Sequence, residues 1–231
     1  MRRLFIYAAL VATAALAVPV LLAPVAGAQT TTNLDAFCAK YIEIGNSEGK
    51  AQLALIEEVI PLAPANLVQP ITEVRDAFKT LGGNKAYAKV SEQIATVDAF
   101  AYASCPGNAV ALTAIDYEYQ GMPATLPAGL NKFKLTNAAP KEAHEFGIAK
   151  LTAAGAAMDP QKLLALPEKK LGKFVDFEHA SGTYAEPGTS GYTVADLDPG
   201  TYIYLCSLHV GGKKTGPLHF MKGMYGIVTV A

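Results

Sequence analysis

Residues 199–230 read PGTYIYLCSLHVGGKKTGPLHFMKGMYGIVTV. The segment begins with a Pro-Gly turn and an apolar run, Tyr202–Leu205, and it ends with a second apolar run, Ile227–Val230. Runs that are apolar on both faces are typical of central strands in a buried sheet. The glycine-rich loop between them holds one of the chain's three cysteines, two of its four histidines and two of its five methionines. This composition indicates a metal site, because soft and imidazole donors in a loop add little to a packed core.

The donor types in this loop narrow the choice of metal. Thiolate and imidazole donors together select zinc, copper or iron, and a thioether shifts the selection toward copper. Two histidines, one cysteine and a weak axial methionine form the trigonal site of blue-copper electron-transfer proteins. The chain offers this set, with one reserve ligand: His144, Cys206, His219 and Met224, and His209 in reserve. Three of them also have a plainer interpretation: Cys206 and Met224 as buried core side chains, and His144 as a surface residue.

The strand pattern extends upstream of the loop. Apolar and polar residues alternate within 115–120, 132–136 and 175–178, which predicts half-buried strands. Turns rich in proline and glycine separate these segments, and only 159–171 has a helical pattern. We therefore expect residues 108–231 to form a β-sandwich or small barrel of Greek-key type.

These residues resemble a known family, the cupredoxins, which are the plastocyanin- and azurin-like blue-copper domains. The resemblance covers about residues 110–231 and none of the preceding half. It is carried by the following motifs: Tyr204-x-Cys206, His219-x4-Met224, and Phe133-x-Leu135-x-Asn137 leading to His144-Glu145-Phe146. The resemblance implies one type 1 copper ion, one-electron transfer, and a redox or copper-exchange protein as partner. It also implies that His219 is the more exposed ligand, through which the electron leaves.

One feature departs from the family pattern. Twelve residues separate Cys206 from His219, whereas family members usually have only a few at this point. We interpret Val210–Leu218 as an insertion that preserves the step from His219 to Met224. Backbone donors from Ser207 or the Asn137 region are expected near the cysteine sulfur. Four apolar residues are expected to form a dry shell: Phe146, Leu218, Phe220 and Met221.

The first half of the mature chain has a helical pattern. Apolar residues recur at three- and four-residue steps between residues 34 and 104, which predicts a bundle of three or four helices. We place this domain at residues 29–107 and the β-domain at 108–231. Cys38 lies in the first predicted helix and Cys105 follows the last, so a disulfide between them would join the two ends of the bundle. Two buried free cysteines are the alternative. The pairing would leave Cys206 as the single thiol.

The N-terminus predicts export. Arg2 and Arg3 precede an apolar stretch that ends in the small residues Ala26-Gly27-Ala28, so we expect a signal peptide at residues 1–28. A membrane anchor is the weaker interpretation, because Pro19 and Pro24 interrupt the stretch. The pattern leaves open whether export uses the general or the twin-arginine route. We expect a secreted, periplasmic or cell-surface protein without stable membrane insertion after cleavage.

Charge and motifs exclude several functions. Cleavage would leave 17 basic residues against 20 acidic ones, which argues against nucleic acid as a partner. A thiol at the end of a buried strand lacks the exposed, electropositive setting of a catalytic nucleophile, so we do not expect an enzyme. The main hypothesis is a type 1 copper protein that acts in one-electron transfer. The alternatives are a metal-free cupredoxin-like surface module, which binds a partner or serves a structural role, and a copper storage or delivery protein.

Overall fold

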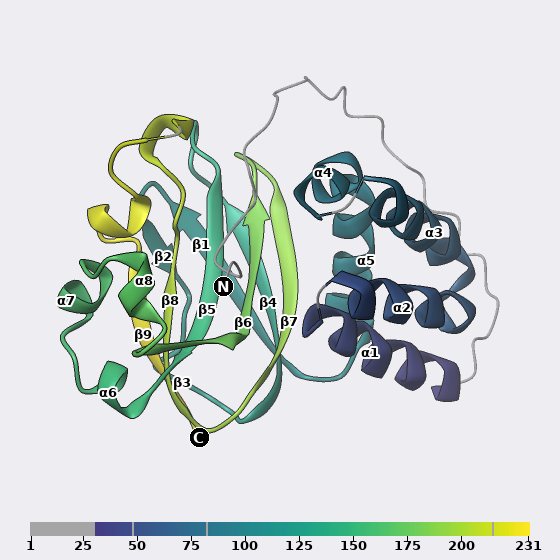
Figure 1. Cartoon of the computed structure of the whole chain (residues 1–231), viewed down its shortest axis with the longest axis horizontal. Coiled ribbons are helices and arrows are strands. Elements are labelled where there is room, and N and C mark those ends of the chain that lie inside the picture. Colours follow the sequence, from purple (N-terminus) through teal and green to yellow (C-terminus); the bar gives the residue numbers. More distant parts are fainter. Residues whose placement is uncertain (1–30, 48, 82, 214) are drawn as a thin grey trace.

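The computed structural model describes residues 31–47, 49–81, 83–213 and 215–231. The expected signal peptide, residues 1–28, lies outside the described residues. Figure 1 shows a set of helices beside a β-sandwich. The last helix of the first part ends at Ser104 and the first strand begins at Asn108. The predicted fold class, a helical bundle followed by a Greek-key β-sandwich, is confirmed.

The helical part contains five α-helices and one 3-10 turn among its described residues. They are α1 (Thr31–Gly45), α2 (Gly49–Val59), η1 (Ile60–Leu62), α3 (Ala65–Thr80), α4 (Gly83–Lys89) and α5 (Ser91–Ser104). The pattern predicted three or four helices. The count differs because α4 and α5 are separated by the single non-helical residue Val90, whose φ is −122°. The buried faces of these helices form one apolar core that includes Phe37, Leu67 and Ala101.

A disulfide joins the two ends of the bundle, as predicted. Cys38 in α1 and Cys105 after α5 are bonded, and both residues are buried. The bond closes a loop across a sequence separation of 67 residues. Among the described residues Cys206 is the free cysteine, and it is buried.

The β-part is a sandwich of two sheets. Its strands are β1 (Asn108–Ile115), β2 (Glu118–Gln120), β3 (Thr125–Leu126), β4 (Gly129–Asn137), β5 (His144–Leu151), β6 (Val175–Ala185), β7 (Ser190–Leu197), β8 (Gly200–Leu205) and β9 (Tyr225–Val230). One sheet has the order β2-β1-β4-β7, and the other has the order β3-β9-β8-β5-β6. The pairs β1–β4 and β3–β9 are parallel, and the other pairs are antiparallel. Strand β8 lies between β9 and β5, which explains why Tyr202–Leu205 is apolar on both faces.

The main core fills the space between the two sheets. Phe133 and Leu135 from β4 face Phe146 and Ile148 from β5, and all four are fully buried. Cys206 belongs to this same cluster. The end of β8 is therefore anchored in the main core between the two sheets.

Two predicted elements differ in detail. The alternating segment 115–120 is not one strand, because the chain reverses between β1 and β2 with Asp116 at a φ of 48°. The predicted helix 159–171 is broken into α7 (Pro160–Leu164) and α8 (Glu168–Leu171), and α6 (Ala153–Ala156) precedes them. Pro167 stands directly before α8, where its ring and missing N–H prevent a continuous helix.

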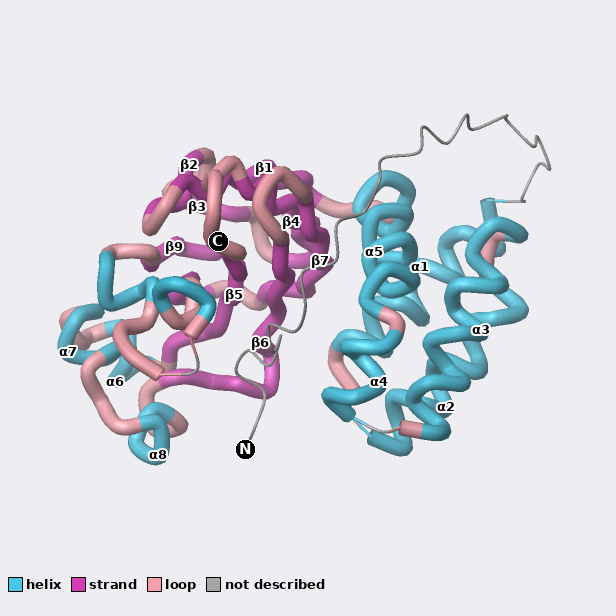
Figure 2. The backbone as a smooth tube through the Cα atoms, turned by 90° about the horizontal axis from the view of Figure 1, so that it is seen from above, coloured by secondary structure: helices cyan, strands magenta, loops and turns pink. Residues whose placement is uncertain are grey.

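The bundle packs on one side of the sandwich and α6–α8 lie on the other (Figures 1 and 2). Helices α5 and α1 contact β7, and α5 also contacts β4. Lys132 of β4 is buried beneath α5. Its Nζ donates a 2.7 Å hydrogen bond to the Cys105 carbonyl and lies 5.7 Å from the Tyr102 ring centroid. The outer face of β4 is thus covered, although its alternation predicted an exposed face.

None of the helices among the described residues combines the length and the apolar character needed to cross a bilayer.

Candidate metal centre

The predicted ligands come from four positions at one end of the sandwich. His144 is the first residue of β5, Cys206 directly follows β8, His219 is the first residue of the 3-10 turn η3 (His219–Lys222), and Met224 directly precedes β9. Strands β5, β8 and β9 are neighbours in one sheet, so its hydrogen bonds hold these positions side by side.

The insertion is closed off at its base. His209 and Leu218 form an isolated antiparallel bridge, and the Val210 N–H donates to the Pro217 carbonyl at 3.0 Å. Beyond that bridge the His219 N–H donates to the Leu208 carbonyl at 2.8 Å. The chain therefore returns after the insertion to nearly the point where it left. As a result, twelve intervening residues do not separate His219 from Cys206 in space.

Three donors converge in the interior. The ligand atoms of His144, Cys206 and His219 all lie within 4.8 Å of one another. His219 Nδ1 is 3.3 Å from Cys206 Sγ and 3.2 Å from His144 Nδ1. Metal bonds of about 2.0 Å to nitrogen and 2.3 Å to sulfur in a trigonal plane require N···N and N···S separations of about 3.5 and 3.8 Å. The observed separations are a few tenths of an ångström shorter, so a small ion fits after a minor expansion.

The two imidazoles are neutral and thus able to bind a metal. Burial, reinforced by the nearby His219, lowers the pKa of His144 to about 4. Burial also lowers the pKa of His219. His144 Nε2 is buried and has no hydrogen-bond partner among the described residues, so this ring is held mainly by packing and by its contact with His219.

The pKa of the Cys206 thiol is shifted in the opposite direction. Burial, followed by the effect of the Glu145 carboxyl, raises the pKa of Cys206 to about 12. A metal ion would have to replace the thiol proton, and its positive charge would stabilise the thiolate in this buried place. The Glu145 N–H lies 3.4 Å from the sulfur and donates to it.

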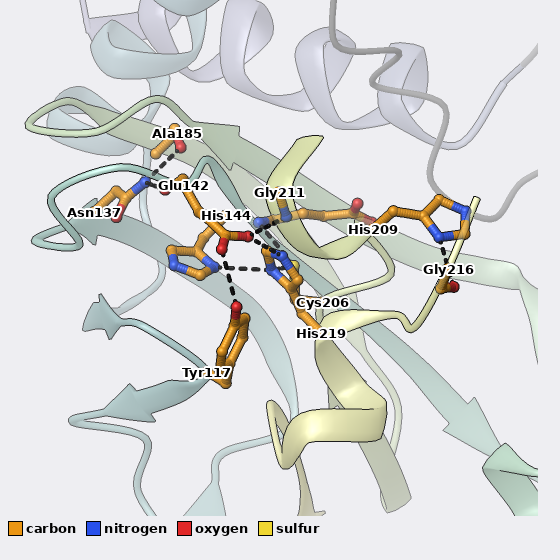
Figure 3. A network of polar contacts seen from close by, with 11 residues as sticks. Tyr117, Asn137, Glu142, His144, Ala185, Cys206, His209, Gly211, Gly216 and His219 are labelled. Atoms are coloured by element: carbon orange, nitrogen blue, oxygen red, sulfur yellow. Dashed lines mark hydrogen bonds and ion pairs between the residues drawn. The ribbon is translucent and has the colours of Figure 1, made fainter. Parts of the chain in front are cut away.

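Glu142 connects His219 to the rest of the site (Figure 3). Its carboxylate lies 2.8 Å from His219 Nε2 and accepts hydrogen bonds of 2.9 Å from the Tyr117 hydroxyl and from the Gly211 N–H. Partial burial opposes ionisation of Glu142, but these three donors lower the pKa of the carboxyl overall. The Gly211 bond comes from the insertion, which thereby ties itself to the group that orients His219. With the acceptor on Nε2, the Nδ1 lone pair of His219 is directed to the common point.

Several expectations about the surroundings are wrong. His219 is 1% exposed, so the ring does not reach the surface as the resemblance implied. It is covered because Glu142 and Tyr117 lie against its outer edge. The backbone of Asn137 does not serve the sulfur, since its N–H donates to the Thr189 carbonyl at 2.9 Å. Its side chain bonds the carbonyls of Glu142 and Ala185 and so holds the loop before β5. Within the expected dry shell Phe146 is fully buried, but Met221 is 60% exposed.

The remaining candidates are placed as follows. Met224 is fully buried in the same cluster as Cys206, and its carbonyl accepts the Cys206 N–H at 3.0 Å. Its role as axial ligand stays a prediction. The ring of His209 turns away from the other histidines to the Gly216 carbonyl, 2.9 Å from its Nδ1 (Figure 3). It is not a member of the three-donor group.

Sheet order, ligand positions and donor set now agree. A two-sheet sandwich carries a buried cysteine at the end of a central strand, a histidine at the start of the neighbouring strand, and a second histidine in the loop between the last two strands. The fold and the donor set of the C-terminal domain resemble those of the cupredoxins. This domain also carries the long loop between Cys206 and His219 and a carboxylate on its second histidine.

Comparison with known proteins gave structural matches alone. No family model and no curated protein matches this sequence. Among solved structures, an auracyanin of Roseiflexus castenholzii is 23% identical, with 54% of this chain and 98% of that chain covered and a TM-score of 0.36. Auracyanin A of Chloroflexus aurantiacus, described as a "blue" copper protein, is 18% identical, with coverages of 55% and 100% and a TM-score of 0.34. Rusticyanin of Thiobacillus ferrooxidans is 20% identical, with coverages of 55% and 79% and a TM-score of 0.33.

The sequence reasoning missed four residues around the donors. Glu142 and Tyr117 contact His219, and Gly211 donates to Glu142. The buried carboxyl of Glu145 lies beside the thiol and accepts a hydrogen bond from Ser207. The sequence did indicate that the two glutamates lie near the site, because both are within two residues of His144 in the segment Lys141–Glu145. Their charge suggested a surface loop instead. Burial raises the pKa of Glu145 well above its usual range, and the hydrogen bond from Ser207 opposes this shift only in part.

Proposed function

We propose that this protein is an exported type 1 copper protein that transfers single electrons and is not an enzyme. One observation carries the proposal: two neutral imidazoles and one buried thiol, from three separate segments, are directed at a common point. A bound copper ion would alternate between its two oxidation states and thus accept and release one electron.

The chain's own residues would keep this exchange easy. His144 and Cys206 are fixed at the ends of paired strands, so the ligand positions change little when the charge of the site changes. Met224 is buried next to the cysteine and would supply the weak axial contact. The Glu145 N–H at the sulfur would lower the electron density on the thiolate.

Burial supports an electron-transfer role over catalysis. His144, Cys206 and His219 are between 0 and 1% exposed, and a substrate would need direct access to the ion. An electron needs no such opening. Glu142, whose side chain is 25% exposed, and Tyr117 lie between His219 and the surface, and we propose that a redox partner docks over them.

Export is part of the proposal. The disulfide between Cys38 and Cys105 is typical of chains that fold in an oxidising compartment. The N-terminal sequence supports the same location, in the periplasm or outside the cell.

The test is metal analysis with an absorption spectrum of the full mature chain. The wild type and His209→Ala should bind one copper ion per chain and show an intense visible thiolate-to-copper band. Cys206→Ser should lose that band, because the thiolate is its source. His209→Ala is the matched control, because this ring lies outside the donor group.

The other outcomes separate the alternatives. A wild type that stays colourless and binds no copper would contradict the proposal and favour a metal-free surface module. Tight binding of Cu(I) without reversible voltammetry would also contradict it and indicate copper storage or delivery.

A further inference from the structure

A pocket lies where the bundle meets the sandwich. Its volume is about 250 Å³. All five helices of the bundle contribute to its wall, and the opposite wall is made by Ala180–Gly182 of β6 and by Thr193 and Val194 of β7. Pockets between domains are preferred places for small-molecule binding.

Most of the side chains that line the pocket are apolar. Half-buried side chains of Tyr41, Phe78, Tyr87 and Ile94 line it, beside the fully buried Phe37. A cavity of about 150 Å³ with such walls is enough to bind benzene. By proportion, a pocket of this size accepts a ligand of about ten non-hydrogen atoms.

One charged group interrupts the apolar wall. Asp98 of α5 lines the pocket and accepts a 2.7 Å hydrogen bond from the Tyr41 hydroxyl. Burial raises the pKa of Asp98 to about 7, and the Tyr41 bond only partly opposes this effect. Among the described residues, the lining includes no lysine, arginine or histidine, so none of them supplies a positive partner for this carboxylate within the pocket. A buried carboxylate is costly without such a partner.

We propose that this pocket binds a small amphipathic amine. The apolar part of the ligand, a single ring or short chain, would lie against the aromatic and aliphatic wall, and its ammonium group would pair with the Asp98 carboxylate. The polar groups Gln52, Ser181 and Thr193 in the same lining leave room for one further hydroxyl or carbonyl on the ligand. This site is separate from the proposed metal centre and gives the helical half a function of its own.

Three ring compounds of similar size and different charge test the proposal by titration calorimetry. They are 2-phenylethylamine, 2-phenylethanol and 3-phenylpropanoate, added to the full metal-free chain at pH 8. The amine should bind at least tenfold more tightly than the alcohol, and the carboxylate should not bind. Asp98→Asn should reduce amine affinity to that of the alcohol, because the amide can still accept the Tyr41 bond but carries no charge.

A second variant checks the location. Val194 reaches from β7 into the bundle core and lines the pocket. Val194→Phe should abolish binding of the amine and of the alcohol, while copper binding at the distant site and cooperative unfolding are retained. The proposal is overturned if none of the three compounds binds the wild type at millimolar concentration. It is also overturned if Asp98→Asn binds the amine as tightly as the wild type.

Discussion

The carboxylate of Glu142 is the residue that distinguishes this centre. It accepts from three groups at once, and one of them is the ring of a proposed ligand. The negative charge of Glu142, next to a proposed ligand, favours the more highly charged oxidation state of a bound ion.

Glu142→Gln should therefore raise the reduction potential. The expected rise is roughly 60 to 120 mV, for one charge about 6 Å from the ion at an effective dielectric constant of about 20 to 40. Protein-film voltammetry measures it. In the metal-free variant His219 should keep its tautomer, because the amide oxygen can still accept a hydrogen bond from Nε2. Nitrogen NMR checks this without any metal. Glu118→Gln, an exposed carboxylate on β2, is the control and should leave both readouts unchanged.

Asp98 predicts a dependence of stability on pH. Because its pKa in the folded state is about 7, above the ordinary aspartate value of 3.8, the folded protein holds an extra proton between these two pH values. The contribution of Asp98 is therefore most favourable below about pH 4, and the free energy of unfolding falls as pH rises to about 7, by at most about 4 kcal/mol. Asp98→Asn should remove this slope in urea titrations at pH 4 to 8. An equal slope in the variant would show that other groups cause the pH dependence. Asp35→Asn, at an exposed position of α1, serves as the control.

The donor set could be predicted from the sequence, but its surroundings could not. The types and spacing of His144, Cys206 and His219 suffice to name a site, since few roles use a thiol and two imidazoles together. The exposure of His219 depends on Glu142 and Tyr117, which reach it from other segments. No spacing rule within one segment records such contacts.

At the scale of elements, the disulfide fixes the ends of the bundle. Replacing both Cys38 and Cys105 with alanine should lower the free energy of unfolding by about 4 kcal/mol, since a loop of this length regains its freedom in the unfolded chain. Urea titration measures the loss. Cys206→Ala without copper should cost less, because it closes no loop. Equal losses would contradict the assignment of the disulfide as the main covalent stabiliser.

Strands were easier to predict than their connections. Tyr202–Leu205 and Ile227–Val230 lie within β8 and β9, because apolar residues on both faces require a central position. The reversal at Asp116 was missed because a β-turn without glycine or proline leaves the alternation intact. The helix expected at 159–171 is broken where Pro167 lies, a signal that the apolar period concealed.

At the scale of the whole molecule, Lys132 links the two parts. Lys132→Met keeps the length of the side chain but removes the hydrogen bond to the Cys105 carbonyl and the charge over Tyr102. We expect a loss of about 2 kcal/mol in the free energy of unfolding, because the carbonyl is left unpaired at the interface. Lys134→Met, two residues along the same strand, is the matched control and should cost less than about 0.5 kcal/mol. Equal effects would mean that the bond contributes little to docking.

The docking of bundle on sandwich could not be predicted from the chain. The alternation within β4 places Lys132 on the polar face of the strand. That face is buried only because α5 packs against it. A lysine that is buried by a neighbouring domain has the same local sequence pattern as one in water.

The order of the cysteines along the chain has a consequence for biogenesis. Cys38 and Cys105 both precede Cys206 in the chain. The last helix of the bundle ends at Ser104, directly before Cys105. A chain that emerges with its N-terminus first can oxidise this pair before the third sulfur is available. The last thiol then arrives without a competitor for exchange, and burial beside β5 protects it from scrambling until an ion is delivered.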